Sequence, residues 1–123
     1  MWTYEQATGW LISPSGKRLV QGYSGHPPSG VNNPALQMVA KMGPLPRGFY
    51  TILPPVDSPE HGPDAMPLLP DQDNEMFGRS GFMIHGDSLQ HPGYASLGCI
   101  IVPRFARDRI IDTLASDNRL QVI

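Results

Sequence analysis

The stretches that decide the fold are Phe82-Met83-Ile84-His85-Gly86 and Ser96-Leu97-Gly98-Cys99-Ile100-Ile101-Val102. Each contains a short apolar run of the kind that forms a buried strand, bounded by turn residues. The first run ends in His85, whereas the second begins with Cys99, directly after a turn of small residues. If the two strands pair side by side, His85 and Cys99 meet at one end of the sheet.

Glycine and proline set the character of the remaining chain. The 123 residues include 13 glycines and 14 prolines, roughly twice the average usage. They interrupt nearly every window that could hold a long helix, which excludes a helical bundle. Because 40% of the residues are hydrophobic, the chain can still build a core and is not a charge-driven disordered segment. We therefore expect one domain over residues 1–123, mainly β (α+β) and rich in turns.

Further strands are expected wherever aromatic and β-branched residues lie between turn residues. These ranges are Trp2–Gln6, Trp10–Ser13, Arg18–Ser24, Gly48–Leu53 and Arg119–Ile123.

Two short helices are expected, at Pro34–Met42, where Asn33 can act as the N-cap, and at Pro103–Ser116. The segment Pro54–Arg79 is dense in proline, aspartate and glycine and has no periodicity. Its length predicts a functional loop or a lid rather than a simple connection.

Bulk properties exclude several classes of protein. A formal net charge of −2 gives no sign of a nucleic-acid-binding surface. A single cysteine excludes an intramolecular disulfide and a cysteine-rich zinc module. No apolar run approaches the roughly 18 residues of a membrane span. The first residues lack the basic and apolar regions of a secretory signal peptide, so we expect no Sec-type export signal.

The single thiol, Cys99, has two readings. A lone cysteine in an apolar strand is usually an inert core residue. Its position directly after Ser96-Leu97-Gly98 favours a reactive role, because such a turn exposes the sulfur and aligns backbone N–H groups that can hold an oxyanion.

A nucleophilic thiol also needs a base, because the thiolate is the attacking species. His85 fits this role, since Gly86 lets the backbone bring a carbonyl to the second ring nitrogen and so fix the tautomer. The other histidines, His26, His61 and His91, lie among proline and glycine and are predicted to be loop or turn residues.

Two motifs together resemble the active-site signature of the L,D-transpeptidase (YkuD-like) family. They are Ile84-His85-Gly86 and Ser96-Leu97-Gly98-Cys99-Ile100, and Cys99 lies fourteen positions after His85. The segment Pro44–Ile52 also resembles the strand that those domains carry upstream. The form of the motif is most similar to the small L,D-transpeptidase-like effectors of type VI secretion systems. The resemblance extends from about Trp2 to Val102 and implies a small β-sandwich or barrel of short strands.

The resemblance implies a role for each matching residue. Cys99 would be the nucleophile, His85 the base and Gly86 the donor of the orienting carbonyl. The backbone N–H groups of Gly98 and Cys99 would form the oxyanion site. Leu97 departs from the pattern, because most relatives have a second histidine there.

Three further residues are candidates for substrate contact. Ser96 belongs to the motif itself. Asp87 can orient a substrate amine or simply cap a turn. Arg104 can replace the arginine that many relatives have at the position of Ile101, or can be a solvated residue in the first turn of a helix.

The function implied by the resemblance is that of a peptidoglycan-modifying cysteine enzyme. It would act on stem tetrapeptides through a thioester acyl-enzyme, with no cofactor and no metal. Attack by water gives L,D-carboxypeptidase cleavage, a D-amino acid gives exchange and a second stem peptide gives a cross-link. The small size and the missing second histidine favour cleavage and exchange.

The implied setting is antibacterial. The protein would be made in a bacterial cytoplasm, act in the periplasm of a target cell and be neutralised by an immunity protein that blocks the site. Two alternatives stay open. One is a metal-dependent hydrolase that uses His85, Asp87 and His91 with Cys99, all legitimate zinc ligands. The other is a non-catalytic module that binds the cell wall.

Overall fold

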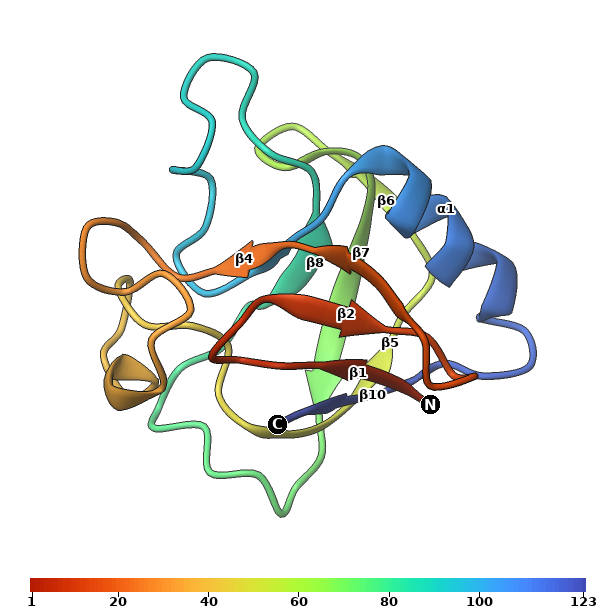
Figure 1. The fold of residues 1–123 in the computed structure, drawn as a ribbon, viewed down its shortest axis with the longest axis horizontal. Helices are drawn as coiled ribbons and strands as arrows, with labels where there is room; N and C mark the ends of the chain where they lie inside the picture. The colour runs from red at the N-terminus through yellow and green to blue at the C-terminus, as the bar shows by residue number, and fades with distance from the viewer.

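Ten short strands form one mixed sheet in the computed structural model, which describes residues 1–123 (Figure 1). The strands are β1 (Trp2–Tyr4), β2 (Trp10–Ile12), β3 (Arg18–Gln21), β4 (Tyr23–Ser24), β5 (Gly48–Ile52), β6 (Val56–Ser58), β7 (Gly62–Pro70), β8 (Met83–His85), β9 (Ile100–Ile101) and β10 (Arg119–Val122). The helical elements are the 3₁₀ turn η1 (Pro34–Leu36) and the helix α1 (Arg104–Thr113). The strand order is β3-β2-β1-β10-β5-β7-β8-β9-β4, and β6 pairs with β7 outside this path.

The first and last strands in this order are joined by a single residue. β3 and β4 lie at opposite edges of the sheet, yet only Gly22 separates them in the chain. The sheet therefore curls back on itself, and Figure 1 shows β1 and β2 in front of β7. A Cβ atom on Gly22 would lie 2.2 Å from the carbonyl oxygen of Ile101, so only glycine fits at this closure. The mainly β fold that the sequence predicts is confirmed.

The core fills the inside of the curled sheet. Inward residues of three adjacent strands, Trp2, Leu120 and Tyr50, are paired in register and fully buried. A slip of one residue would turn these side chains to the outside, so their burial fixes the register. The helix α1 adds Ala106 and Ile110 to the same core. No helix is long and apolar enough to cross a membrane.

The expected helix at Pro34–Met42 is wrong beyond its first turn. Only η1 forms, with the side chain of Asn33 capping it as expected, and the chain then continues in turns through Lys41, whose φ is +63°. The segment does not form a buried helix face, since Met38 is 48% exposed. The backbone carbonyl of Gln37 instead accepts a hydrogen bond from Arg79, so a tertiary contact decides the local conformation. The second predicted helix is confirmed as α1.

The segment Pro54–Arg79 is not a long loop or lid. Its first part is a hairpin of β6 and β7, and β7 is the longest strand, paired with β5, β6 and β8. Ala65 and Met66 are fully buried in it. The burial of these side chains outweighs the proline content that led us to expect a loop.

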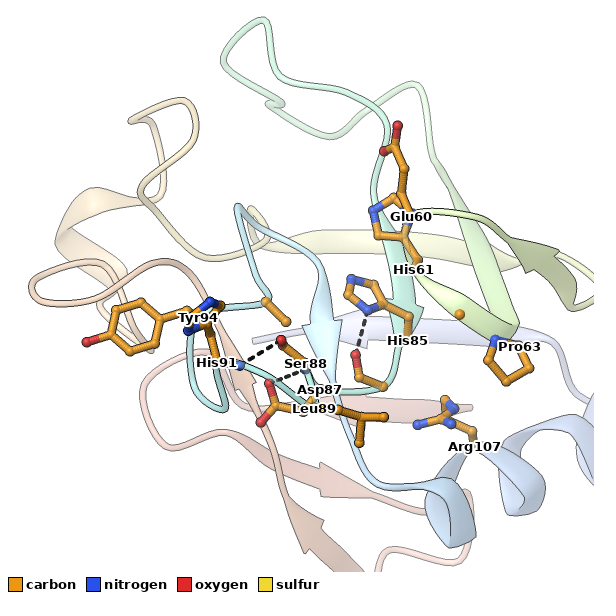
Figure 2. A pocket seen from close by; sticks show the side chains of 13 residues that line it. Glu60, His61, Pro63, His85, Asp87, Ser88, Leu89, His91, Tyr94 and Arg107 are labelled. Carbon is orange, nitrogen blue, oxygen red and sulfur yellow. Dashed lines mark hydrogen bonds between the residues drawn. The ribbon is translucent and has the colours of Figure 1, made fainter.

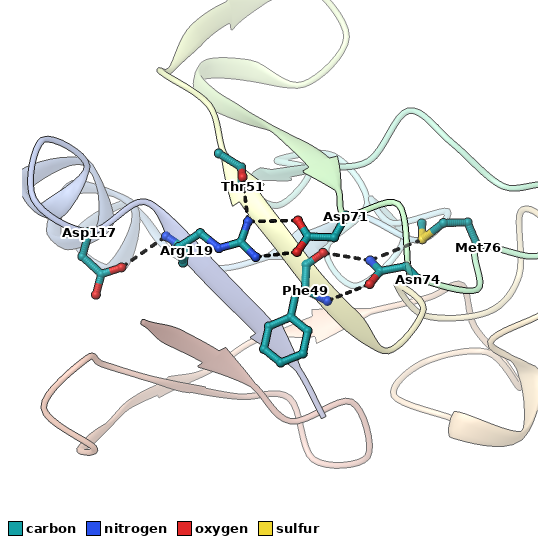
Figure 3. A network of polar contacts seen from close by, with 7 residues as sticks. All are labelled: Phe49, Thr51, Asp71, Asn74, Met76, Asp117 and Arg119. Atoms are coloured by element: carbon teal, nitrogen blue, oxygen red, sulfur yellow. Dashed lines mark hydrogen bonds and ion pairs between the residues drawn. The ribbon is translucent and has the colours of Figure 1, made fainter.

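A polar network fastens the chain that follows β7 to its neighbours (Figure 3). The guanidinium of Arg119 donates to both carboxylate oxygens of Asp71, at 2.9 and 2.6 Å, and to the hydroxyl of Thr51 at 2.8 Å. The side-chain amide of Asn74 exchanges two hydrogen bonds with the backbone of Phe49. The stretch after β7 is thus tied to β5 and β10.

Candidate active site

The pairing of β8 and β9 places the cysteine and the histidine on one face of the sheet. The two strands are parallel, with Ile84 opposite Ile100. Cys99 directly precedes β9 and therefore lies opposite Met83, two residues before His85. Because alternate residues of a strand face the same side, Cys99 and His85 share a face, while the two isoleucines are buried in the core. The ring nitrogen of His85 and Sγ of Cys99 lie within 4.8 Å of each other.

The imidazole of His85 is held by the next residue. Its Nδ1 lies 2.8 Å from the carbonyl oxygen of Gly86 (Figure 2). Since a carbonyl can only accept, the proton is on Nδ1 and Nε2 carries a free lone pair. The side chain is 2% exposed, and Nε2 has no hydrogen-bond partner. A buried acceptor without a partner beside a thiol is suited to remove the proton of that thiol.

The electrostatic environment favours the neutral forms of both groups. Burial raises the pKa of the Cys99 thiol, although the backbone N–H of Met83 and the charge of Arg79 oppose this. Burial lowers the pKa of His85, and the hydrogen bond to Gly86 opposes it. These shifts do not support a resting thiolate–imidazolium pair. The site is better described as a thiol next to a neutral base.

The turn before Cys99 is fixed by two buried serines. The hydroxyl of Ser96 donates to the carbonyl oxygen of Cys99 at 2.6 Å and accepts from the N–H groups of Gly98 and Gly25. The hydroxyl of Ser24 donates to the carbonyl of Gly98 at 2.9 Å. Ser96 is fully buried, so the expectation that it contacts substrate is wrong. The N–H of Gly98 is already used, which removes it from the expected oxyanion site and leaves that of Cys99.

Arg79 is a buried cation that the sequence did not single out. Its guanidinium donates to four carbonyl oxygens, those of Gln37, Gly43, Pro44 and Leu97. Its positive charge also lowers the pKa of Cys99. Arg79 thus joins the turns around residues 37–44 to the cysteine turn and places a positive charge near the sulfur.

Two hollows meet at the cysteine–histidine pair. One, of about 780 Å³, is lined by His85 and by residues of the loop 86–95 (Figure 2). The other, of about 470 Å³, is lined by Cys99, Arg79 and Phe82. His61 lines both hollows. A chain-like substrate can therefore lie across the sulfur with one part on each side.

A family model described as the Tlde1 domain matches residues 18–123. The chain belongs to the Tlde1 domain family. This is a type VI secretion effector family with L,D-transpeptidase-like activity, for which peptidoglycan is a fitting substrate. No curated protein matches the chain significantly. The range matched by the Tlde1 model contains both Cys99 and His85.

Two roles were expected for Asp87, orienting a substrate amine or capping a turn. In this Tlde1 domain it caps a turn. Its carboxylate accepts hydrogen bonds from the backbone N–H groups of Ser88 and Gly93 and, at 2.6 Å, from the hydroxyl of Tyr23. Tyr23 in turn accepts from the N–H of Ala95. Asp87 therefore shapes the loop that lines the larger hollow.

Arg104 lies outside the site, which corrects the expectation of a substrate contact. It forms ion pairs with Asp64 at 2.6 Å and with Asp108 at 3.3 Å, and it lines neither hollow. Arg107, one helical turn further, lines the larger hollow and donates to the carbonyl of Val102 at 2.8 Å. The helical period could have indicated this, because Arg107 shares a face with the buried Ile110.

The structure does not assemble the alternative metal set of His85, Asp87 and His91 with Cys99. The only group of potential ligands that comes together is His61, His85 and Cys99. His61, expected to be an ordinary loop residue, lies at the end of the β6–β7 turn with its ring centroid 4.6 Å from that of His85. Nothing in the local sequence of His61 signals this, because the contact depends on the hairpin.

Proposed function

We propose that residues 1–123 act as one catalytic domain that removes or exchanges the terminal D-amino acid of peptidoglycan stem tetrapeptides. One observation carries the proposal: a ring nitrogen of His85 lies within 4.8 Å of Sγ of Cys99, while Nδ1 is held by Gly86 and Nε2 is buried without a partner. A nucleophile, a base and a group that orients the base are the parts that covalent acyl transfer needs. Membership of the Tlde1 family supports the choice of substrate.

The reaction begins with the neutral pair. Sγ of Cys99 attacks the carbonyl carbon of the amide between the L-stereocentre of diaminopimelate and the D-amino acid, while Nε2 of His85 takes the thiol proton. The N–H of Cys99 and the charge of Arg79 are the groups available to stabilise the oxyanion. One preorganised donor of this kind contributes about 3–4 kcal/mol in studied enzymes.

The second half releases the product. His85 returns its proton to the amine of the departing D-amino acid, and a thioester to Cys99 remains. Water then gives cleavage, or another D-amino acid gives exchange, with His85 again taking the proton of the attacking group. The hollows on both sides of the sulfur support this, since one can hold the acyl part while the other holds the leaving or entering group.

The proposed setting is the periplasm of a target cell, with an immunity protein that covers the site. Exposed apolar side chains surround the hollows and suit such a partner: Leu89 is 98% exposed, and Tyr94 and Leu97 are more than half exposed. Leu89→Asp is expected to weaken binding of the immunity protein while Cys99 stays reactive. Unchanged binding would argue against a partner that covers this face.

The test of the enzymatic proposal is incubation with purified muropeptide tetrapeptides, read by mass spectrometry. We expect the wild-type protein to release the terminal D-alanine, or to exchange it when another D-amino acid is added. Cys99→Ala is the matched control, because it removes only the sulfur. An unchanged tetrapeptide with folded wild-type protein would reject the proposal, and release by Cys99→Ala would reject this nucleophile.

A further inference from the structure

A zinc site coincides with the proposed catalytic pair. We propose that His61, His85 and Cys99 bind one Zn²⁺ ion through Nε2, Nε2 and Sγ, and that the bound ion blocks the thiol. Imidazole nitrogen and thiolate sulfur are both zinc ligands, and three protein ligands with a fourth position open to water are the arrangement of catalytic zinc sites. One ring nitrogen of each histidine and Sγ of Cys99 all lie within 4.8 Å of one another.

The orientation of both imidazoles fits metal ligation. A histidine that binds a metal usually has its other ring nitrogen engaged in a hydrogen bond. Nδ1 of His85 bonds to the carbonyl of Gly86 at 2.8 Å, and Nδ1 of His61 lies 3.1 Å from the hydroxyl of Ser58. Both rings therefore present Nε2 to the site. That of His85 is buried and without a partner in the protein, and burial of an unsatisfied polar atom is costly unless something binds it.

The spacing leaves room for the ion after a small movement. Bonds of about 2.0–2.3 Å in a tetrahedral zinc site bring ligand atoms to roughly 3.3–3.7 Å from one another, so these atoms must approach by about 1 Å. His85 and Cys99 are fixed by the sheet, whereas His61 lies at the end of the β6–β7 turn and is only half-buried. This turn can supply the movement. The fourth position opens toward the hollows and can hold water.

Binding and catalysis exclude each other at this position. The thiol proton leaves to solvent as the Zn–S bond forms, and the ion occupies the lone pair that His85 would use as a base. Inhibition by zinc is the part of the inference that rests on the proposed function, whereas binding depends only on the three ligands.

Cobalt(II) provides a readout that is independent of activity, because a cobalt–thiolate bond has a charge-transfer absorption in the near ultraviolet. We expect metal-free wild-type protein to show this band at one equivalent of Co²⁺ and to lose it when Zn²⁺ is added. Cys99→Ser should abolish the band. His61→Ala should weaken zinc affinity by at least 10–100-fold, because even the loss of a residue that only hydrogen-bonds to a metal ligand costs that much. His91→Ala is the matched control, since His91 is exposed and outside the cluster, and should bind as the wild type does.

The outcomes separate the two proposals. Absence of the band in wild-type protein, or an equal band in His61→Ala and in the wild type, would overturn the zinc site. His61→Gln, compared with His61→Ala by circular dichroism, separates ligand loss from misfolding. Muropeptide turnover that one equivalent of zinc does not inhibit would overturn the block of the thiol. A normal cobalt band without turnover in metal-free protein would overturn the proposed function and leave the site standing.

Discussion

Nδ1 of His85 donates to the carbonyl oxygen of Gly86 at 2.8 Å. This contact between neighbours in the chain determines that Nε2, and not Nδ1, faces Cys99. A Cβ at position 86 would lie 2.6 Å from a guanidinium nitrogen of Arg107, so a larger residue would have to displace the side chain that donates to the carbonyl of Val102. The Arg107 side chain of helix α1 thus packs closely against Gly86.

The first prediction concerns pH. Because burial lowers the pKa of His85, kcat/KM of chelator-treated protein should be high above that pKa and fall as the pH drops through it. The midpoint should lie below about 6.5, the usual value for histidine. A pH profile of D-alanine release measures this. A midpoint clearly above 6.5 would show that His85 is charged at rest.

The second prediction concerns the thiol alone. Because burial raises the pKa of Cys99, alkylation by iodoacetamide should be slow at pH 7 and should accelerate with a midpoint above about 8.5, the usual thiol value. The rate of mass gain by the intact protein follows the reaction. Fast alkylation that does not vary between pH 6 and 8 would indicate a resting ion pair and contradict this account.

The third prediction concerns Gly98, whose φ is +134° and whose Cβ would lie 2.5 Å from the ring of Phe82. Gly98→Ala should cost about 2–5 kcal/mol of unfolding free energy and reduce turnover at least 100-fold, since a shift of about 1 Å at the sulfur has effects of that size. Gly16→Ala is the matched control, because Gly16 has φ +87° but open space around it. It should lose about 1–2 kcal/mol and keep its activity. Equal behaviour of the two variants in urea unfolding and turnover would contradict the steric argument.

Whether the sequence predicts a part of this site depends on how far apart in the chain the contacting residues lie. Strand pairing and side-chain alternation were enough to bring Cys99 and His85 together, because β8 and β9 are short, apolar and adjacent in the sheet. The prediction of a helix at Pro34–Met42 failed, because the carbonyl of Gln37 accepts a hydrogen bond from the distant Arg79. His61 was missed for a similar reason, since a hairpin that looked like a loop carries it.

The fourth prediction tests Arg79 as the residue that joins the loops around the site. Arg79→Met should lower the unfolding free energy by about 3–5 kcal/mol, because it leaves buried carbonyl groups without a donor. It should also move the alkylation midpoint of Cys99 upward, since the positive charge is lost. Arg79→Lys retains the charge and should restore the midpoint but not the stability. Full stability of Arg79→Lys would show that the forked geometry is unimportant.

The fifth prediction concerns acid stability. The hydrogen bonds from Arg119 lower the pKa of Asp71 below its unfolded value, so the stabilisation is present above the usual aspartate pKa of about 3.9. It is lost as the pH falls through the lower pKa of the folded protein. Asp71→Asn should be less stable than the wild type at pH 7 and equally stable at the acid end. Urea unfolding between pH 2 and 7 measures both, and a constant difference over that range would contradict the linkage.

The central claim is that Cys99 forms a thioester with the stem peptide. It is tested most directly by acid-quenching metal-free protein soon after mixing with tetrapeptide and measuring the mass of the intact protein. We expect an added mass equal to the acyl part of the tetrapeptide without its terminal D-amino acid, located on Cys99 by peptide mapping and absent from Cys99→Ser. D-alanine release by wild-type protein with no such adduct at any quench time, or with the adduct on another residue, would contradict it.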